Sequence, residues 1–140
     1  MNSKAKVLVV EDETPLAMLI VHLLTAAGCD VCAAHTGRRA MELAAQTKFD
    51  LIVLEAHLPD VDGLMVCGEL KQRHISRLTP VVFTSHCVTE EDRQKCLEVG
   101  AADFIVRPFE ADDFIFRVES LFKNNKTNQK RESKIEKVTA

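Results

Sequence analysis

Five short apolar runs alternate with five segments of helical periodicity, and this alternation constrains the fold more than any other feature of the chain. The apolar runs predict strands over residues 6–11, 30–35, 51–54, 80–85 and 103–106. The segments between and after them space apolar residues three and four apart, which predicts helices over residues 15–27, 37–46, 63–73, 89–99 and 110–122. Strands that alternate with helices through short loops form a parallel sheet covered on both faces. The sequence therefore predicts an α/β, doubly wound fold.

Local signals support three of these elements. Gly28 is expected just after the first helix, where a left-handed backbone conformation is common. Thr89 and Asp92 have the spacing of a capping box at the start of the fourth helix. Residues 51–54 are all apolar, which predicts a strand that is buried on both faces.

The length and the charge distribution predict one folded domain followed by a tail. The chain has 140 residues and no apolar run long enough to span a bilayer, and its first residues lack the apolar core of a signal peptide, so a cytoplasmic location is expected. Residues 123–140 hold six basic and two acidic residues, a net charge of +4, which leaves −7 on residues 1–122. We expect a domain over residues 1–122 and a polar basic tail or linker over 123–140, disordered or a helical extension.

The five cysteines do not indicate a metal or redox site. Cys29 and Cys32 have C-x-x-C spacing, but they lie where a helix ends and a strand begins, whereas a redox pair opens a helix after a strand. A structural role is favoured for both.

The residues at the carboxyl ends of the strands are the candidates for function, because ligands of open parallel sheets bind at that edge. The ends carry these residues: Glu11, Asp12 and Glu13; Glu55 and His57; Thr84, Ser85 and His86; Arg107, Pro108 and Phe109. His35 ends the second strand and is expected on the far side of the switch point in strand order, away from the pocket. Clustered carboxylates and a carbonyl suit Mg²⁺, and a hydroxyl with a fixed cation suits phosphoryl oxygens. The pattern indicates a place where a carboxylate is phosphorylated.

Four segments in order carry a resemblance to a known family: EDE, LIVLE followed by PDVDG, PVVFTS, and GAADFIVRPF. Together they resemble the receiver domain of two-component response regulators, over residues 4–122. The resemblance implies a CheY-like, flavodoxin-like (βα)5 sheet in the order 2-1-3-4-5. It also implies phosphorelay signal transduction through a sensor kinase or an output domain as protein partner. No enzyme activity, membrane contact or direct binding of nucleic acid by this domain is expected.

The resemblance also implies a role for several residues. Glu11 and Asp12 would form the acidic pair, with Asp12 as the main metal ligand and the backbone carbonyl of His57 as a second one. Thr84 would be the switch hydroxyl, which closes on a phosphoryl group, and Phe104 would be the aromatic residue that turns inward with it. Pro108 would follow a cis peptide bond.

Two residues depart from the family pattern. The family phosphorylates an aspartate where this chain has Glu55, and it has a lysine where this chain has Arg107. Asp60 and Asp62 lie in the loop after the strand and do not replace the missing aspartate.

Three interpretations follow for this site. In the first, Glu55 substitutes for a phosphorylated aspartate and pairs with Arg107, without Mg²⁺ or phosphate, and Thr84 and Phe104 take an active-like inward arrangement. In the second, the site is vestigial and the domain serves protein binding. In the third, Glu55 is phosphorylated and the domain controls a DNA-binding output absent from this chain. An engineered replacement of aspartate would leave Arg107 unexplained.

A different class of function is a divalent transition-metal site, whose nitrogen and oxygen ligands would be Asp12, Glu55, His57 and His86. An independent enzyme is not indicated, because the chain has no Ser/Cys–His–acid pattern, no P-loop and no G-x-G-x-x-G.

Residues 90–118 resemble the face by which response regulators with a winged-helix output form symmetric dimers through charge pairs. Arg93, Asp113 and Arg117 match that pattern, and Ala102 replaces a family aspartate. The resemblance implies a homodimer through the fourth helix, fifth strand and fifth helix.

Overall fold

The computed structural model describes residues 4–86 and 89–122, which form a five-stranded parallel sheet in the order β2-β1-β3-β4-β5. The strands are β1 (Lys6–Val10), β2 (Asp30–Ala34), β3 (Leu51–Glu55), β4 (Val81–Ser85) and β5 (Asp103–Val106). The helices are α1 (Thr14–Ala26), α2 (Gly37–Gln46), α3 (Gly63–Gln72) and α4 (Glu90–Glu98), with a final helix at residues 111–122. The predicted doubly wound fold and its strand order are confirmed.

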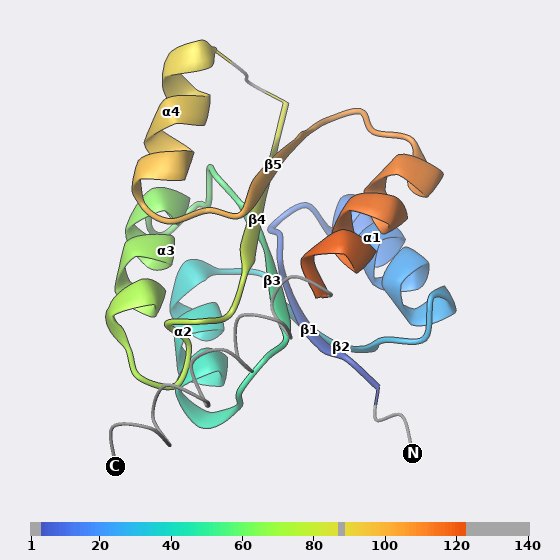
Figure 1. Ribbon diagram of the computed structural model, residues 1–140, viewed down its shortest axis with the longest axis horizontal. Coiled ribbons are helices and arrows are strands. Elements are labelled where there is room, and N and C mark those ends of the chain that lie inside the picture. The colour runs from blue at the N-terminus through green and yellow to red at the C-terminus, as the bar shows by residue number, and fades with distance from the viewer. Residues whose placement is uncertain (1–3, 87–88, 123–140) are drawn as a thin grey trace, which may run out of the picture.

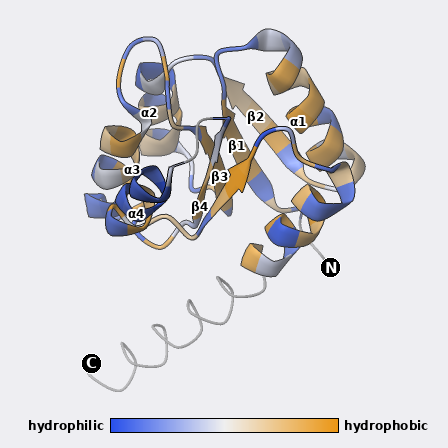
Figure 2. Ribbon diagram, turned by 90° about the horizontal axis from the view of Figure 1, so that it is seen from above, coloured by the Kyte–Doolittle hydropathy of each residue, from blue (hydrophilic) through white to orange (hydrophobic). Residues whose placement is uncertain are grey.

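Helices cover both faces of the sheet, with α2, α3 and α4 on one side and α1 and the final helix on the other (Figure 1). Alternate strand residues therefore enter two different cores. In β1, for example, Leu8 and Val10 pack toward α2 and α3, whereas Val7 and Val9 pack toward α1 and the final helix. Seen from above, the apolar strands lie between the two helical layers (Figure 2). This burial on both faces holds the carboxyl ends of the strands in fixed positions.

The predicted bounds agree with the observed ones to within a residue, which is the usual uncertainty of helix and strand ends. Gly28 has a φ of 95°, and the capping box of Thr89 and Asp92 is present. Every residue of β3 is buried, as its unbroken apolar run predicted. Cys29 and Cys32 are both free thiols. In the described part of the chain, no helix has the length and apolar character needed to cross a bilayer.

The predicted tail, residues 123–140, lies outside the described residues.

Candidate functional site

Three buried polar side chains lie in a row across the carboxyl edge of the sheet. Val10 of β1 pairs with Leu54 of β3, so the next residues, Glu11 and Glu55, are neighbours. Glu55 in turn pairs with Thr84 of β4. Glu11 is 1% exposed and Glu55 is 2% exposed. Parallel pairing thus places two carboxylates side by side away from water, where at least one needs a counter-charge or a proton.

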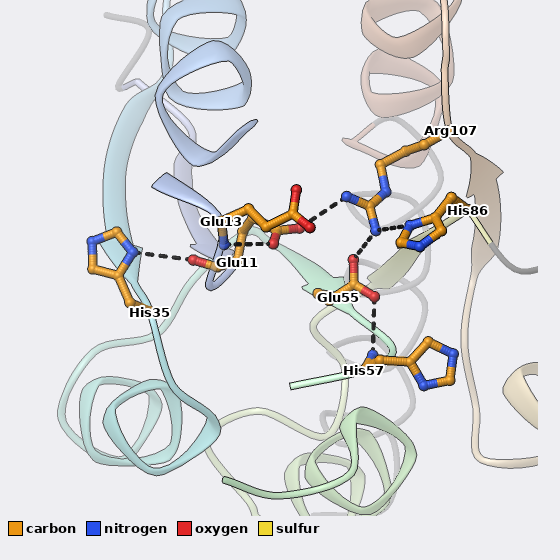
Figure 3. Close-up of polar contacts among 7 residues, drawn as sticks. All are labelled: Glu11, Glu13, His35, Glu55, His57, His86 and Arg107. Atoms are coloured by element: carbon orange, nitrogen blue, oxygen red, sulfur yellow. Dashed lines mark hydrogen bonds and ion pairs between the residues drawn. The ribbon is translucent and has the colours of Figure 1, made fainter. Parts of the chain in front are cut away.

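Arg107 supplies the counter-charge. Its backbone follows β5, where its N–H donates to the Ser85 carbonyl at 2.9 Å, and the Arg107–Pro108 peptide bond is cis. The guanidinium points back over the sheet edge, with Nη2 at 2.5 Å from Oε2 of Glu55 and Nη1 at 3.6 Å from Oε1 of Glu11 (Figure 3). One cation therefore serves both carboxyl groups.

Backbone N–H groups hold the other carboxylate oxygens. The N–H of His57 donates to Oε1 of Glu55 at 3.0 Å, so both oxygens of Glu55 are engaged. The N–H of Glu13 donates to Oε2 of Glu11, also at 3.0 Å. Within the described residues, Oε1 of Glu11 and Nε of Arg107 are buried without a hydrogen-bond partner.

The pKa of Glu11 is raised from its ordinary 4.5 to about 7, chiefly because burial disfavours the charged carboxylate. The hydrogen bond from the Glu13 N–H lowers the pKa, the negative charge of Glu55 raises it, and the charge of Arg107 lowers it. At neutral pH, Glu11 is therefore protonated in a large fraction of the molecules. In that state the single positive charge of Arg107 balances the single negative charge of Glu55.

Two histidines touch the edge of this cluster. Nη2 of Arg107 lies 2.9 Å from Nδ1 of His86, an exposed residue, and the ring nitrogen accepts because a guanidinium only donates. Nδ1 of His35 lies 3.1 Å from the carbonyl oxygen of Glu11 (Figure 3). This contact is to the backbone of Glu11, on the side away from Glu55 and Arg107 (Figure 3), so the placement of His35 away from the pocket stays a prediction. The Glu11 N–H donates to the Ala34 carbonyl, which continues the β1–β2 pairing and brings His35 beside Glu11.

The acidic loop residues serve other purposes. Asp12, expected as the main metal ligand, is exposed, whereas the ion pairs of Arg107 are with Glu11 and Glu55. Asp60 accepts the N–H groups of Gly37 and Arg38 at 2.9 and 3.0 Å, at the start of α2. These acids do not contribute to the carboxylate pair.

The cluster of Glu11, Glu55 and Arg107 does not fit Mg²⁺. A bound Mg²⁺ needs carboxylate oxygens that face open coordination positions. Both oxygens of Glu55 already accept hydrogen bonds, and a fixed positive charge lies 2.5 Å from one of them. A divalent cation would have to displace Arg107 to reach this carboxylate.

The alternative transition-metal site is not assembled either. Across residues 4–86 and 89–122, no group of three or more His, Cys, Asp or Glu residues is arranged to hold a metal ion. The reason is geometric: Asp12 faces solvent, His86 contacts Arg107, and His57 reaches Glu55 through its backbone N–H.

The remaining predicted residues lie on β4, β5 and the final helix. Thr84 is buried beside Glu55, and the side chain of Phe104, 6% exposed, packs in the core under α2, α3 and α4. Arg117 pairs within its own chain, with Asp103 at 3.6 Å and Asp113 at 3.4 Å. Arg93 is exposed on α4.

Comparison with known proteins agrees with this architecture. The family described as "Response regulator receiver domain" matches residues 7–119. The alkaline phosphatase synthesis transcriptional regulatory protein PhoP of Bacillus subtilis is 34% identical over 120 residues, covering 86% of this chain and 49% of PhoP. The response regulator ArlR of Staphylococcus saprophyticus is 31% identical over 118 residues, covering 84% of this chain and 52% of ArlR.

Among solved structures, the receiver domain of the Francisella response regulator 1452 is similar, with a TM-score of 0.80 and 30% identity over 86% of this chain and 98% of that one. The chain spans about half the length of PhoP and ArlR. A receiver domain of this family is not a classical enzyme. The matched family, the strand order and the edge cluster lead to one conclusion: the chain belongs to the receiver domains of two-component response regulators.

Proposed function

We propose that this receiver domain signals without being phosphorylated, through protein–protein contacts, with Glu55 and Arg107 in place of the phosphoaspartate and its bound metal. The observation that carries the proposal is the buried ion pair between Arg107 and Glu55, which extends to Glu11. A nucleophilic carboxylate needs a free oxygen in line with the phosphoryl donor. Both oxygens of Glu55 are engaged, so attack would require the pair to break first.

The chemistry of the two departing residues supports the same proposal. A glutamate brings a charge of about −1, compared with roughly −1.5 to −2 for a phosphate group, so a single cation suffices to balance it. Arginine stays protonated throughout the physiological pH range and offers several donors in a plane. Arg107 uses two of its nitrogens on two carboxyl groups, which a lysine ammonium would reach less readily. On this proposal Mg²⁺ is not a resident cofactor.

The partners follow from the family and from the length of the relatives. PhoP and ArlR are about twice as long as the matched region, which supports a sensor kinase or an output domain as the protein partner. We also propose that the domain is located in the cytoplasm. We further propose a homodimer through α4, β5 and the final helix, where Phe116 is 70% exposed and Val106 is 46% exposed.

The test is phosphorylation by acetyl phosphate with Mg²⁺, followed by mass spectrometry of the intact protein. It compares the unaltered chain with Glu55→Asp and with the double variant Glu55→Asp/Arg107→Lys. We expect no phosphate on the unaltered chain, because Glu55 is locked by Arg107 and His57. We expect a hydroxylamine-sensitive phosphate on the double variant, because the shorter acid and the lysine recreate the family pattern.

The single variant Glu55→Asp separates the effect of the glutamate from the effect of the arginine. If the single variant is phosphorylated, the glutamate by itself blocks the reaction. If the double variant is phosphorylated and the single variant is not, Arg107 blocks the reaction as well. A hydroxylamine-sensitive phosphate on Glu55 of the unaltered chain would overturn the proposal and favour a working phosphoacceptor. If both variants also stay unmodified, the vestigial interpretation replaces the proposal.

A further inference from the structure

A groove of about 490 Å³ lies between α2 and α3, on the opposite face of the sheet from α1. Its apolar lining consists of Met41, Ala45, Val61, Met65 and Val66. The two helices lie side by side in Figure 1 and contact each other along this groove. The volume is in the range of sites that bind ligands or partner side chains.

Met65 is a large apolar side chain exposed at this groove. Its side chain is 64% exposed although it lies at an apolar groove, and Met41 on the facing helix is half-buried. Methionine side chains adapt to the shape of a partner and are frequent on binding surfaces. Met65 therefore offers an exposed apolar contact next to Met41, which packs partly against the core.

The charges around the groove indicate what binds there. Arg73 closes one end, where Nη2 pairs with Glu69 at 3.3 Å and Nη1 donates to the carbonyl of Met41 at 3.3 Å. Glu42 pairs with Arg39 at 3.1 Å. Arg38 lies at the other end, and its side chain has no ion-pair partner among residues 4–86 and 89–122.

We propose that the α2–α3 groove binds an amphipathic helix of a partner protein, with apolar side chains over Met41 and Met65 and a carboxylate beside Arg38. A helix fits because the ridge of side chains along one helix packs into the groove between two others. The carboxylate fits because the Arg38 side chain is a positive charge at this end of the groove that no ion pair within the described residues neutralises. This surface is separate from the α4–β5 face and goes beyond the proposed function.

The groove is connected to the carboxylate site by the loop of residues 57–62. Val61 lines the groove and packs on Gly37, where a Cβ atom would lie 2.2 Å from its methyl group. The preceding residue, Asp60, holds the first N–H groups of α2. The same loop begins at His57, whose N–H holds Glu55.

The experiment uses the full 140-residue chain with ¹³C-labelled methionine methyl groups and two synthetic peptides. One peptide has leucines at positions i, i+4 and i+7 of a helix-forming alanine–lysine host, with a glutamate one turn before the first leucine. The other has the same composition with the leucines shuffled around the helix. We expect the ordered peptide to shift the methyl signals of Met41 and Met65 but not that of Met18 on α1.

Three variants test the assignment. Met65→Glu should weaken binding about tenfold or more, whereas Met18→Glu should not change it, because Met18 is exposed to the same degree (66%) on another face. Arg38→Glu should weaken binding by roughly threefold to tenfold, and a peptide with lysine in place of the glutamate should restore it.

Equal binding of the shuffled peptide, or binding unchanged by Met65→Glu, would overturn the proposal. The proposal would also be overturned if the free chain formed a dimer that Met65→Glu abolished. The occupant of the groove would then be a second copy of this chain.

Discussion

At the scale of single residues, the main feature of the site is how the charges of its buried carboxyl groups are balanced. Glu11 and Glu55 are both almost fully buried, and two ionised carboxylates side by side would repel each other strongly in a medium of low polarity. Arg107 neutralises Glu55, and burial raises the pKa of Glu11 to about 7, which favours a proton on Glu11. Removing one partner of such a buried pair would leave an uncompensated charge, so the three groups act as a unit.

The raised pKa of Glu11 predicts a specific dependence of stability on pH. Between its ordinary pKa of 4.5 and its folded pKa of about 7, the folded protein holds a proton that the unfolded chain has released. The free energy of unfolding should therefore fall as the pH rises through this window, by roughly 3 kcal/mol from this group. Glu11→Gln is neutral at every pH and should lose this dependence. Its stability relative to the unaltered chain should rise from pH 5 to pH 8.

Urea unfolding followed by circular dichroism at pH 5, 6, 7 and 8 measures this difference. Glu13→Gln is the control, because its side chain is exposed at the same end of β1. Parallel pH profiles for Glu11→Gln and the unaltered chain would show that Glu11 keeps an ordinary pKa.

At the scale of elements, the start of α3 fixes the position of Glu55. Asp62 caps α3 by accepting the N–H of Leu64 at 2.9 Å, and the N–H of Gly63 donates to the Ala56 carbonyl at 3.0 Å. A Cβ atom on Gly63 would lie 2.4 Å from the backbone oxygen of Glu55. The helix thus packs directly on the end of β3, as only a glycine allows.

Two glycines of the same helix make a matched pair of substitutions. Gly63→Ala should lower the free energy of unfolding by about 1–3 kcal/mol, because the new methyl group meets backbone atoms that cannot move aside independently. Gly68→Ala should be neutral or stabilising by up to about 1 kcal/mol, since nothing lies within 4 Å of its Cβ position. Thermal unfolding of both variants measures the effects. Equal stability of the two variants would mean that α3 shifts away from β3 at little cost.

At the scale of the whole molecule, the two helical layers leave different surfaces for partners. The face formed by α4, β5 and the final helix exposes Phe116 and Val106, beside the ion pairs of Arg117. The α2–α3 groove lies on a separate part of the surface. On the proposed function, the domain acts through such surfaces because they are present without any chemical modification.

The proposed homodimer predicts a concentration-dependent mass. Sedimentation equilibrium of the unaltered chain should show a monomer–dimer equilibrium, and Phe116→Glu should weaken the dimer about tenfold or more by burying a charge in an apolar contact. Met18→Glu, which also changes a highly exposed apolar residue but on α1, should leave the equilibrium unchanged. A monomer at all concentrations, or a dimer that Phe116→Glu leaves intact, would contradict the predicted face.

The sequence by itself determined the topology and the members of the central row. The spacing of apolar residues is a local property of the chain, so it predicted the bounds of the strands and helices to within a residue. The family resemblance predicted the order of the strands in the sheet. Parallel pairing then brings the ends of neighbouring strands to one edge, which is why Glu11 and Glu55 could be named from their positions after β1 and within β3.

The sequence also predicted the pair of Glu55 and Arg107, which the structure confirms. Only the tertiary structure decided that Arg107 reaches Glu11 as well, because that contact depends on side-chain length and direction, which no local pattern encodes. Asp12 next to Glu11 points to solvent, whereas the distant His35 bonds to the Glu11 carbonyl. The proton on Glu11 depends on burial by surrounding elements. Side-chain reach and desolvation are non-local quantities, and they exist only once the helices have packed on the sheet.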